Sequence, residues 1–396
     1  MNGGAVGAGA RRARVAIAHD YLTQRGGAER VVLAMLRAFP DATIHTTLYD
    51  PEGTYPEFRE ARIEVSPLNR IGFFRRHHRA ALPLLALASR GVRTDADVVV
   101  ASSSGWAHGF DHSRSGGVLV YCHNPARWLY QSDTYLGRRA ATSPNGLALL
   151  ALRPFLVHWD KRAAARADVY LANSTVVRER VRAAYGREAD VVAPPFGVDP
   201  ALPASPIDDV ADWAGDGFHL VVSRLLPYKN VHHVVDAFRG LPERLLVIGS
   251  GPMAQELRAR LPDNVRLVSG LTDDQMRWGY ARALALIAPS HEDFGLTPLE
   301  AGAFGRPTLA LHAGGYLDTI TPGLNGTFFA EPTAASIRAA VVADRAVTWD
   351  PVAIAANVRR FDEPRFHEEL RRRVETLLAD ALLADTRASG EQRRSP

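Results

Sequence analysis

Two carboxylates lie eight positions apart in the stretch Glu292-Asp293-Phe294-Gly295-Leu296-Thr297-Pro298-Leu299-Glu300. The apolar run before it, 283–288, predicts a buried strand. Thr297 is a residue type favoured as a helix N-cap, and Pro298 fits the first helical position. The predicted order is therefore strand, loop and helix, with both carboxylates along one crevice at the edge of a sheet.

The charges in this crevice indicate what it can bind. Backbone N–H groups at the start of the predicted helix, together with the positive end of its dipole, favour a diphosphate. Glu300, one turn into the helix, can accept two hydrogen bonds from a ribose diol. Glu292 can orient sugar hydroxyls or stabilise positive charge at an anomeric carbon. For an isolated pair of glutamates, two solvated surface groups are the commoner alternative, so the surrounding sequence decides.

Strand-like runs alternate with helix-like runs along the chain, which predicts parallel sheets with helices on both faces. The predicted strands form two sets: 15–19, 42–48, 97–101, 118–122, 169–172 and 190–193, then 219–223, 244–249, 265–269, 283–288 and 308–311. A chain of 396 residues with 46% apolar content also exceeds the size at which a single core keeps growing. We therefore expect two α/β domains.

The domain boundaries follow from composition. Turn residues replace periodicity over a Pro-, Ala- and Asp-rich stretch that we expect to be the interdomain linker. The expected organisation is a disordered extension over 1–14, a first domain over 15–195, the linker over 196–216, a second domain over 217–360, a helix over 361–380 and a disordered tail over 385–396.

Several motifs resemble those of the retaining glycosyltransferases of family 4. The segment from His291 to Pro307 is similar to the donor-site motif of that family. Other matching pieces occur in the expected order: Gly26-Gly27-Ala28-Glu29-Arg30, Tyr121-Cys122-His123-Asn124-Pro125-Ala126-Arg127, Ser223-Arg224-Leu225-Leu226-Pro227-Tyr228-Lys229 and Gly249-Ser250-Gly251-Pro252. The second of these and the Glu-Asp-Phe-Gly form are most similar to the mannosyltransferase branch that builds O-antigen and related polysaccharides.

This resemblance implies a GT-B fold, in which two facing Rossmann-like domains with parallel sheets enclose an interdomain cleft and a last helix crosses back to the first domain. It implies metal-independent transfer of a hexosyl group, mannose from GDP-mannose, to a saccharide or polyprenyl-linked acceptor, without a cofactor. Two alternatives stay open. One is another enzyme of this fold, such as a sugar-nucleotide epimerase or a phosphorylase, and the other is a non-catalytic nucleotide-sugar-binding subunit.

The predicted catalytic residues are His123, Glu292, Arg224 and Lys229. Arg224 and Lys229 lie between a strand and a helix, so both can converge on phosphate oxygens. His123 follows the strand ending at Cys122, where an imidazole can hydrogen-bond a sugar hydroxyl or a leaving phosphate.

The remaining predicted site residues bind the donor or the acceptor. The donor-binding set is Gly26, Gly27, Gly249, Gly251, Leu271, Asp293, Phe294, Gly295, Leu296, Thr297 and Glu300. The acceptor-binding set is His108, Arg127 and Trp128, in which Trp128 either stacks on a sugar or packs in the core.

The histidine and cysteine spacings predict no metal site. His77 and His78 are adjacent, whereas two imidazoles on one zinc need helical i,i+4 spacing. The one cysteine, Cys122, excludes a disulfide framework and is typical of a reducing cytoplasm.

A basic and apolar block from Asn69 to Leu85 could lie in a membrane interface. Its predicted contacts are Arg70, Phe73, Phe74, Arg75 and Arg76, and a solvated basic helix is the equally weighted alternative. No run approaches the roughly 20 apolar residues of a spanning helix, so we expect a soluble or peripheral protein in the cytoplasm, or at the inner face of the cell membrane. Nucleic acid is not an expected partner, because a stacking ladder and a helix-turn-helix pattern are both missing.

Overall fold

The computed structural model describes residues 13–89, 91–112, 116–131 and 144–392. The chain divides into two compact units. The first comprises Met1–Ala172, Val177–Asp190 and His367–Pro396, and the second comprises Asn173–Val176 and Val191–Phe366. Within the described ranges, no helix is both long and apolar enough to cross a lipid bilayer.

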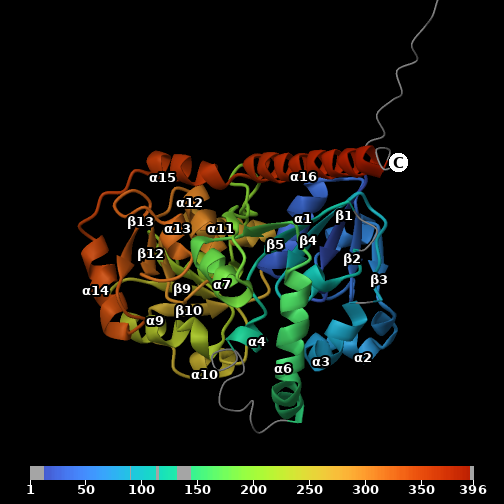
Figure 1. Cartoon of the computed structure of the whole chain (residues 1–396). Coiled ribbons are helices and arrows are strands. Elements are labelled where there is room, and N and C mark those ends of the chain that lie inside the picture. Colours follow the sequence, from blue (N-terminus) through green and yellow to red (C-terminus); the bar gives the residue numbers. More distant parts are fainter. Residues whose placement is uncertain (1–12, 90, 113–115, 132–143, 393–396) are drawn as a thin grey trace, which may run out of the picture. The chain divides into compact units, whose positions relative to one another are not determined.

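The sheet of the first unit has the strand order β3-β2-β1-β4-β5-β6-β7. Figure 1 labels its first five strands, β1 to β5. Its strands are β1 (Val15–His19), β2 (Thr43–Thr46), β3 (Ile63–Val65), β4 (Val98–Ser103), β5 (Val118–Cys122), β6 (Val169–Ala172) and β7 (Asp190–Val191). Neighbours from β3 to β6 pair in parallel, and β4 and β5 are buried along their whole length, as their Val- and Leu-rich sequences predict. The strand order reverses between β1 and β4, so a crevice is expected beyond the carboxyl ends of these two strands.

The helices around this sheet include one from the end of the chain. They are α1 (Gly27–Ala38), α2 (Gly72–Arg76), α3 (His78–Ser89), α4 (Arg127–Tyr130), α6 (Pro144–Ala164), α7 (Thr175–Tyr185) and α16 (Glu363–Gln392). In α16, Leu370, Val374 and Leu377 are buried, and Nε of Arg371 donates a hydrogen bond to the carbonyl of Ala38 at 3.1 Å.

The sheet of the second unit has the order β10-β9-β8-β11-β12-β13, and every neighbouring pair is parallel. Its strands are β8 (Phe218–Val222), β9 (Leu245–Ile248), β10 (Val265–Val268), β11 (Ala283–Ala288), β12 (Thr308–Leu311) and β13 (Gly326–Phe329). Its helices are α8 (Asp208–Ala211), α9 (Val231–Phe238), α10 (Ala254–Arg258), α11 (Asp273–Arg282), α12 (Leu296–Ala303), α13 (Tyr316–Thr319), α14 (Ala334–Asp344) and α15 (Pro351–Val358). Here the strand order reverses between β8 and β11.

The prediction of two parallel α/β sheets is confirmed. Each of the eleven predicted strands is present to within two residues at either end. The prediction misses β3 and β13, each of which lies at one edge of its sheet. Both lack a long apolar run: β3 has three residues, two of them exposed, and β13 begins with a glycine.

Two further segments differ from expectation. Residues 196–216, predicted as a linker, belong to the second unit and contain α8, and Ile207 and Val210 are buried in its core. Helix α16 continues to Gln392, although we expected disorder from Asp385. Residues 379–384 are Ala and Leu apart from Asp380, and these strong helix formers lead the helix into the polar residues that follow.

Candidate active site

In the second unit, a cation and a carboxylate meet where the strand order reverses. Lys229 ends a 3-10 turn (Pro227–Lys229) after β8, and Glu292 follows β11. Nζ of Lys229 forms a short ion pair with Oε1 of Glu292, and the same oxygen accepts a hydrogen bond from Oγ of Ser290. The two charged side chains are only 9% and 23% exposed. The predicted residues Lys229 and Glu292 therefore belong to one polar site.

A buried tyrosine extends this site. Oγ of Ser290 lies 3.4 Å from the hydroxyl of Tyr316. Burial, and secondarily the negative charge of Glu292, raises the pKa of Tyr316 well above its usual value. Tyr316 therefore keeps its proton at neutral pH and remains a hydrogen-bond donor beside Ser290 and Glu292.

Backbone contacts fix the position of Glu292. Its carbonyl accepts a hydrogen bond of 2.9 Å from the N–H of Gly315. A Cβ at Gly314 would lie 2.3 Å from that carbonyl, and one at Gly315 would lie 2.2 Å from Cα of Phe294. On the other side, Nδ2 of Asn230 donates to the carbonyl of Pro289 at 3.0 Å. The loops after β8, β11 and β12 are thus joined around the ion pair.

The prediction that Thr297 caps the following helix is wrong. Helix α12 begins at Leu296, and its N-cap is Gly295, with φ of 90°. A Cβ at Gly295 would lie 2.5 Å from the ring of Tyr316, so glycine is required here by both conformation and space. The half-buried side chains of Asp293, Leu296 and Thr297 surround this start of the helix.

Two other predicted donor residues are buried. Glu300 is 9% exposed, and its Oε2 accepts a hydrogen bond from the hydroxyl of Tyr280. Phe294 packs in an apolar cluster with Leu299 and Phe361, so it supports the loop from the inside. Leu271 packs against the core beside the Thr272 capping box, which the structure confirms.

The two glycines after β9 bring two loops together. A Cβ at Gly249 would lie 1.9 Å from the carbonyl oxygen of Ser223, and one at Gly251 would lie 2.5 Å from that of Leu225. The loop after β8 is therefore held against the turn after β9. Between Ser223 and Leu225, the side chain of Arg224 is exposed, and within the described ranges its guanidinium makes no ion pair. It can meet an anion from solvent.

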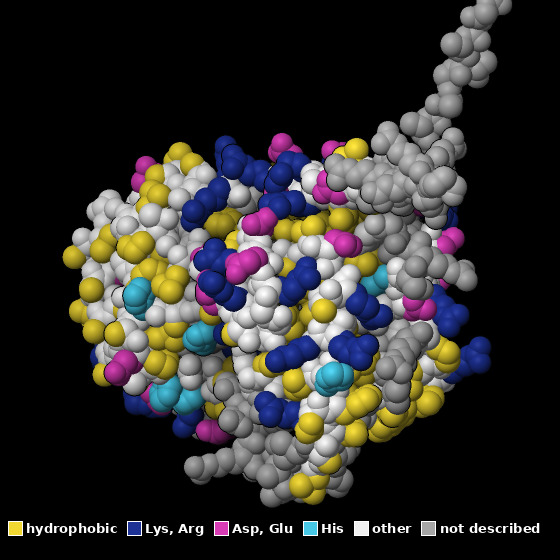
Figure 2. All heavy atoms as spheres, in the orientation of Figure 1, with side chains coloured by type: hydrophobic (Ala, Val, Ile, Leu, Met, Phe, Trp, Pro, Cys, Tyr) yellow, Lys and Arg dark blue, Asp and Glu magenta, His cyan; other side chains and the backbone are white. Residues whose placement is uncertain are grey.

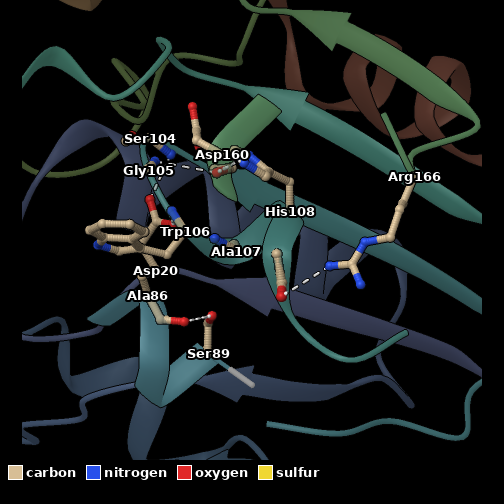
Figure 3. Close-up of polar contacts among 12 residues, drawn as sticks. Asp20, Ala86, Ser89, Ser104, Gly105, Trp106, Ala107, His108, Asp160 and Arg166 are labelled. Atoms are coloured by element: carbon tan, nitrogen blue, oxygen red, sulfur yellow. Dashed lines mark hydrogen bonds and ion pairs between the residues drawn. The ribbon is translucent and has the colours of Figure 1, made fainter. Parts of the chain in front are cut away.

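In the first unit, Asp20 joins the two loops at the strand reversal. Asp20 follows β1, and its carboxylate accepts hydrogen bonds from the N–H groups of Ser104, Trp106 and Ala107 at 2.6 to 2.7 Å (Figure 3). Three backbone donors hold this buried carboxylate in place, so the loops after β1 and β4 have one fixed arrangement.

Two of the predicted acceptor residues lie in the core. Nε2 of His108 contacts Oδ1 of Asp160 at 2.8 Å (Figure 3). Nδ1 of His108 contacts Oγ of Ser103 at 3.2 Å, and the hydroxyl of Tyr130 donates to the other oxygen of Asp160. Trp128 is buried against Trp106, with ring centroids 4.5 Å apart. The structure thus gives His108 and Trp128 packing roles, while Arg127 is half-buried at the start of α4.

His123 belongs to a hydrogen-bonded chain with residues of β1 and β4. Its Nε2 lies 2.8 Å from Oγ of Ser102, and this hydroxyl lies 3.0 Å from Nδ1 of His19. Glu29 is buried close by, and burial raises the pKa of its carboxyl although His19 opposes the shift.

The glycine pair before α1 lies against this carboxyl. Gly26 is the N-cap of α1 and Gly27 its first residue, and a Cβ at Gly26 would lie 2.5 Å from Oε2 of Glu29. The buried carboxyl group of Glu29 therefore packs directly against the turn at Gly26.

Sequence reasoning missed several polar residues of these sites: Asp20, Ser102, Asp160, Tyr280, Ser290 and Tyr316. Asp20, Ser102 and Ser290 could have been found, because each stands just after a predicted strand. The described residues contain no cluster that could hold a metal ion. A cavity of about 980 Å³ in the first unit is lined instead by residues such as Arg14, His45 and Arg371, and none of the predicted site residues lines it.

Two family models match successive parts of the chain. The model described as Glycosyltransferase Family 4 matches residues 25–202, and the one described as Glycosyl transferases group 1 matches residues 211–343.

Several curated proteins are similar to parts of the chain. Identity to D-rhamnosyltransferase WbpZ of Pseudomonas aeruginosa is 25% over 210 residues, 50% of this chain and 51% of that protein. Identity to O-antigen chain mannosyltransferase C of Escherichia coli is 29% over 130 residues, 30% of this chain and 35% of that protein. The chain thus spans about half the length, or less, of these relatives.

Solved structures agree with the fold. The Anabaena HepE protein in complex with UDP-glucose superposes with a TM-score of 0.64 at 18% identity, covering 91% of this chain and 99% of that one. Sucrose-phosphate synthase from Thermosynechococcus elongatus superposes with a TM-score of 0.66 at 18% identity, covering 93% of this chain and 100% of that one. Together with the two parallel sheets, these similarities establish the GT-B fold. With the two family models spread along its length, the chain belongs to the glycosyltransferases of family 4.

Proposed function

We propose that this chain is a retaining glycosyltransferase that transfers mannose from GDP-mannose to a saccharide or polyprenyl-linked saccharide acceptor. The observation that carries the proposal is the Lys229–Glu292 pair at the strand reversal of the second unit, with Arg224 exposed on the same segment after β8 as Lys229. A crevice with two cations and a positioned carboxylate suits a sugar diphosphate. The similarity to an O-antigen mannosyltransferase supports mannose as the sugar.

The two cations act on the leaving group. Nζ of Lys229 has three N–H bonds, of which one is directed to Glu292, so two can bind diphosphate oxygens. The guanidinium of Arg224 can bind a further phosphate oxygen in a bidentate manner. Both charges then stabilise the negative charge that develops as the bond to the sugar breaks, and no metal ion is needed for this step.

The transfer step conserves configuration. The acceptor hydroxyl oxygen forms a bond to the anomeric carbon on the face from which the diphosphate leaves, while the bond from that carbon to the phosphate oxygen breaks. The hydroxyl proton passes to a leaving phosphate oxygen. Glu292, held by Lys229 and Ser290, orients the sugar hydroxyls and stabilises the oxocarbenium-like transition state. Glu300, held by Tyr280, is the carboxylate that we assign to the ribose diol.

The test combines binding with turnover. Thermal unfolding is measured with GDP-mannose, UDP-glucose, UDP-N-acetylglucosamine and the free diphosphates, because a ligand of the native state raises the unfolding temperature. We expect the largest shift with GDP-mannose, and release of GDP only when an acceptor is added, also in the presence of EDTA. Acceptor-independent release would indicate another GT-B reaction, and binding without turnover on any acceptor would indicate a non-catalytic subunit.

We also propose that the first unit contacts a membrane through α2, α3 and α6. Helix α3 packs against both α2 and α6. Large apolar side chains are exposed on these helices and just before them, and three exposed arginines lie among them. We call this set the basic-apolar patch. Its residues are Ile71, Phe73, Leu84, Leu147, Leu152, Phe155, Arg70, Arg75 and Arg76. Figure 2 shows hydrophobic side chains gathered over α2, α3 and α6 at the lower right, with Lys and Arg beside them.

Charge supports an anionic lipid surface as the partner. Residues 65–94 and 144–159 contain no Asp or Glu, so no carboxylate on these segments would repel lipid phosphates. The exposed aromatic and aliphatic groups can enter the interface while the arginines bind headgroups. Phe74, which we predicted as a contact, packs toward the core instead and is not part of this patch.

A further inference from the structure

We propose that Ser102 is a positioning residue that holds His123 in the tautomer whose proton is on Nδ1. This rests on the proposed function only where it concerns transfer, because the hydrogen-bonded chain itself is a property of the first unit. Its consequence is that His123 acts in the transfer as a hydrogen-bond donor through Nδ1, and not as a base through Nε2.

The chain of contacts runs across three neighbouring strands. His19 ends β1, Ser102 lies in β4 directly opposite it, and His123 follows β5. Nδ1 of His19 lies 3.1 Å from the carbonyl oxygen of Ser102 and 3.0 Å from its Oγ. Oγ of Ser102 lies 2.8 Å from Nε2 of His123. All three residues are buried, and Ser102 is completely so.

The carbonyl contact determines the proton on His19. A backbone carbonyl oxygen can only accept a hydrogen bond, so the nitrogen next to it must carry the hydrogen. Nδ1 of His19 is therefore a donor, and the hydroxyl oxygen of Ser102 lies within reach of the same N–H. His19 is then unable to accept a hydrogen bond from Ser102 through this nitrogen.

The hydroxyl hydrogen of Ser102 then has one available hydrogen-bond acceptor. Among the residues that the structure describes, the hydroxyl contacts just two nitrogens, Nδ1 of His19 and Nε2 of His123. A buried hydroxyl hydrogen without an acceptor is unfavourable. Since His19 is a donor, Nε2 of His123 must accept, and a neutral imidazole that accepts at Nε2 carries its proton at Nδ1.

This assignment limits the chemistry of His123. With its Nε2 lone pair bonded to Ser102, His123 cannot take a proton from an acceptor hydroxyl through that nitrogen. Its Nδ1–H can donate to a sugar hydroxyl or a phosphate oxygen. The proton released by the acceptor must then pass to the leaving phosphate, which agrees with the step written above.

The experiment reads the tautomer directly. The protein is labelled with ¹⁵N-histidine, and long-range ¹H–¹⁵N correlation spectra distinguish protonated from unprotonated ring nitrogens. His123 is assigned by the signal that disappears in His123→Gln. We expect an unprotonated Nε2 in the wild-type protein. In Ser102→Ala, we expect the proton to redistribute toward Nε2, and the rate of transfer to fall about tenfold with little change in KM. Ser102→Thr, which keeps the hydroxyl, should restore both.

A matched control is Ser103→Ala. Ser103 is the next residue of β4, is equally buried and contacts a different histidine, His108. We expect this variant to leave the His123 signal unchanged. A protonated Nε2 in the wild-type protein, or an unchanged His123 signal in Ser102→Ala, would overturn the proposal. The wild-type spectrum needs no variant to fold, and it stays informative if no donor sugar is ever transferred, so failure of the proposed function is separable from failure of this inference.

Discussion

Lys229 and Glu292 form an ion pair at the carboxyl ends of two adjacent strands, although they are 63 positions apart in the sequence. Each holds the other in place: Glu292 fixes one donor of the lysine, and Lys229 fixes one oxygen of the carboxylate. The pair is thus pre-organised for a ligand that has a diphosphate and a sugar next to each other.

The first prediction concerns this pair. Glu292→Gln should lower kcat/KM about 100-fold or more, because the negative charge near the anomeric carbon is lost while the shape is kept. Lys229→Met should lower it similarly and reduce the free energy of unfolding by about 2 kcal/mol, since it leaves a partly buried carboxylate without its partner. In the double variant the losses should be smaller than their sum. Additive losses, measured by steady-state kinetics and urea unfolding, would show that the residues act independently.

A second prediction concerns Tyr280 and Glu300. Tyr280→Phe removes the hydrogen bond that orients the Glu300 carboxylate. We expect it to weaken GDP binding about fivefold in calorimetry, the effect of one hydrogen bond. Inorganic pyrophosphate, which has no ribose, is the control ligand and should bind equally well to both proteins. An equal loss for both ligands would contradict the ribose assignment.

A third prediction concerns the turn after β9. Gly249→Ala forces a methyl group toward the carbonyl oxygen of Ser223, and the two loops must separate. We expect a loss of about 3 kcal/mol or more in the free energy of unfolding. Gly72→Ala is the comparison, because its Cβ would meet nothing nearer than an arginine side chain at 3.5 Å. The urea midpoint of Gly249→Ala should therefore be clearly lower than that of Gly72→Ala. Similar midpoints in the two variants would mean that the loops move apart at little cost in free energy.

A fourth prediction is a pH dependence of stability. Burial lowers the pKa of His219, on β8, to about 4. Between that value and its ordinary pKa of about 6.5, the unfolded chain binds a proton that the folded chain does not, so stability falls as pH drops from 6.5 toward 4. His219→Met should remove roughly 3 kcal/mol of this acid sensitivity. Urea unfolding at pH 7 and pH 4.5 measures it, and an unchanged pH dependence in the variant would contradict the assignment.

A fifth prediction tests the basic-apolar patch. Phe73→Ser combined with Phe155→Ser should reduce co-sedimentation with phosphatidylglycerol vesicles, since both rings are more than half exposed. Arg75→Glu should have the same effect, and added salt should weaken binding of the wild-type protein. Leu317→Ser is the matched control, because Leu317 is similarly exposed but lies in the second unit. If the wild-type protein does not co-sediment with these vesicles, the membrane contact is excluded.

The fold was readable from the sequence because buried parallel strands are continuous apolar runs. Such runs mark β1, β5, β11 and β12 to the residue. The edge strands β3 and β13 were missed because neither contains a long apolar run: β3 has three residues, two of them exposed, and β13 begins with a glycine. The start of α12 was misplaced because Thr297 has the residue type of a cap, whereas the left-handed Gly295 is required by the ring of Tyr316, a contact that local sequence does not contain.

The site was readable in part. Motif spacing identified Lys229 and Glu292, yet not that they pair with each other, because their contact depends on β8 and β11 being neighbours. Trp128 and His108 have residue types common in sugar sites, but their partners Trp106 and Asp160 are distant in sequence, and only the packed structure decides between core and surface.

Helix α16 has a consequence for synthesis on the ribosome. Leu377 of this helix packs against Gly117, where an added Cβ would lie 2.6 Å from Cγ of Leu377. Arg371 of the same helix donates a hydrogen bond to the backbone carbonyl of Ala38. The amino-terminal half is translated long before these partners emerge. Part of its apolar surface therefore stays uncovered until α16 has been synthesised, and during that interval this surface is exposed to aggregation.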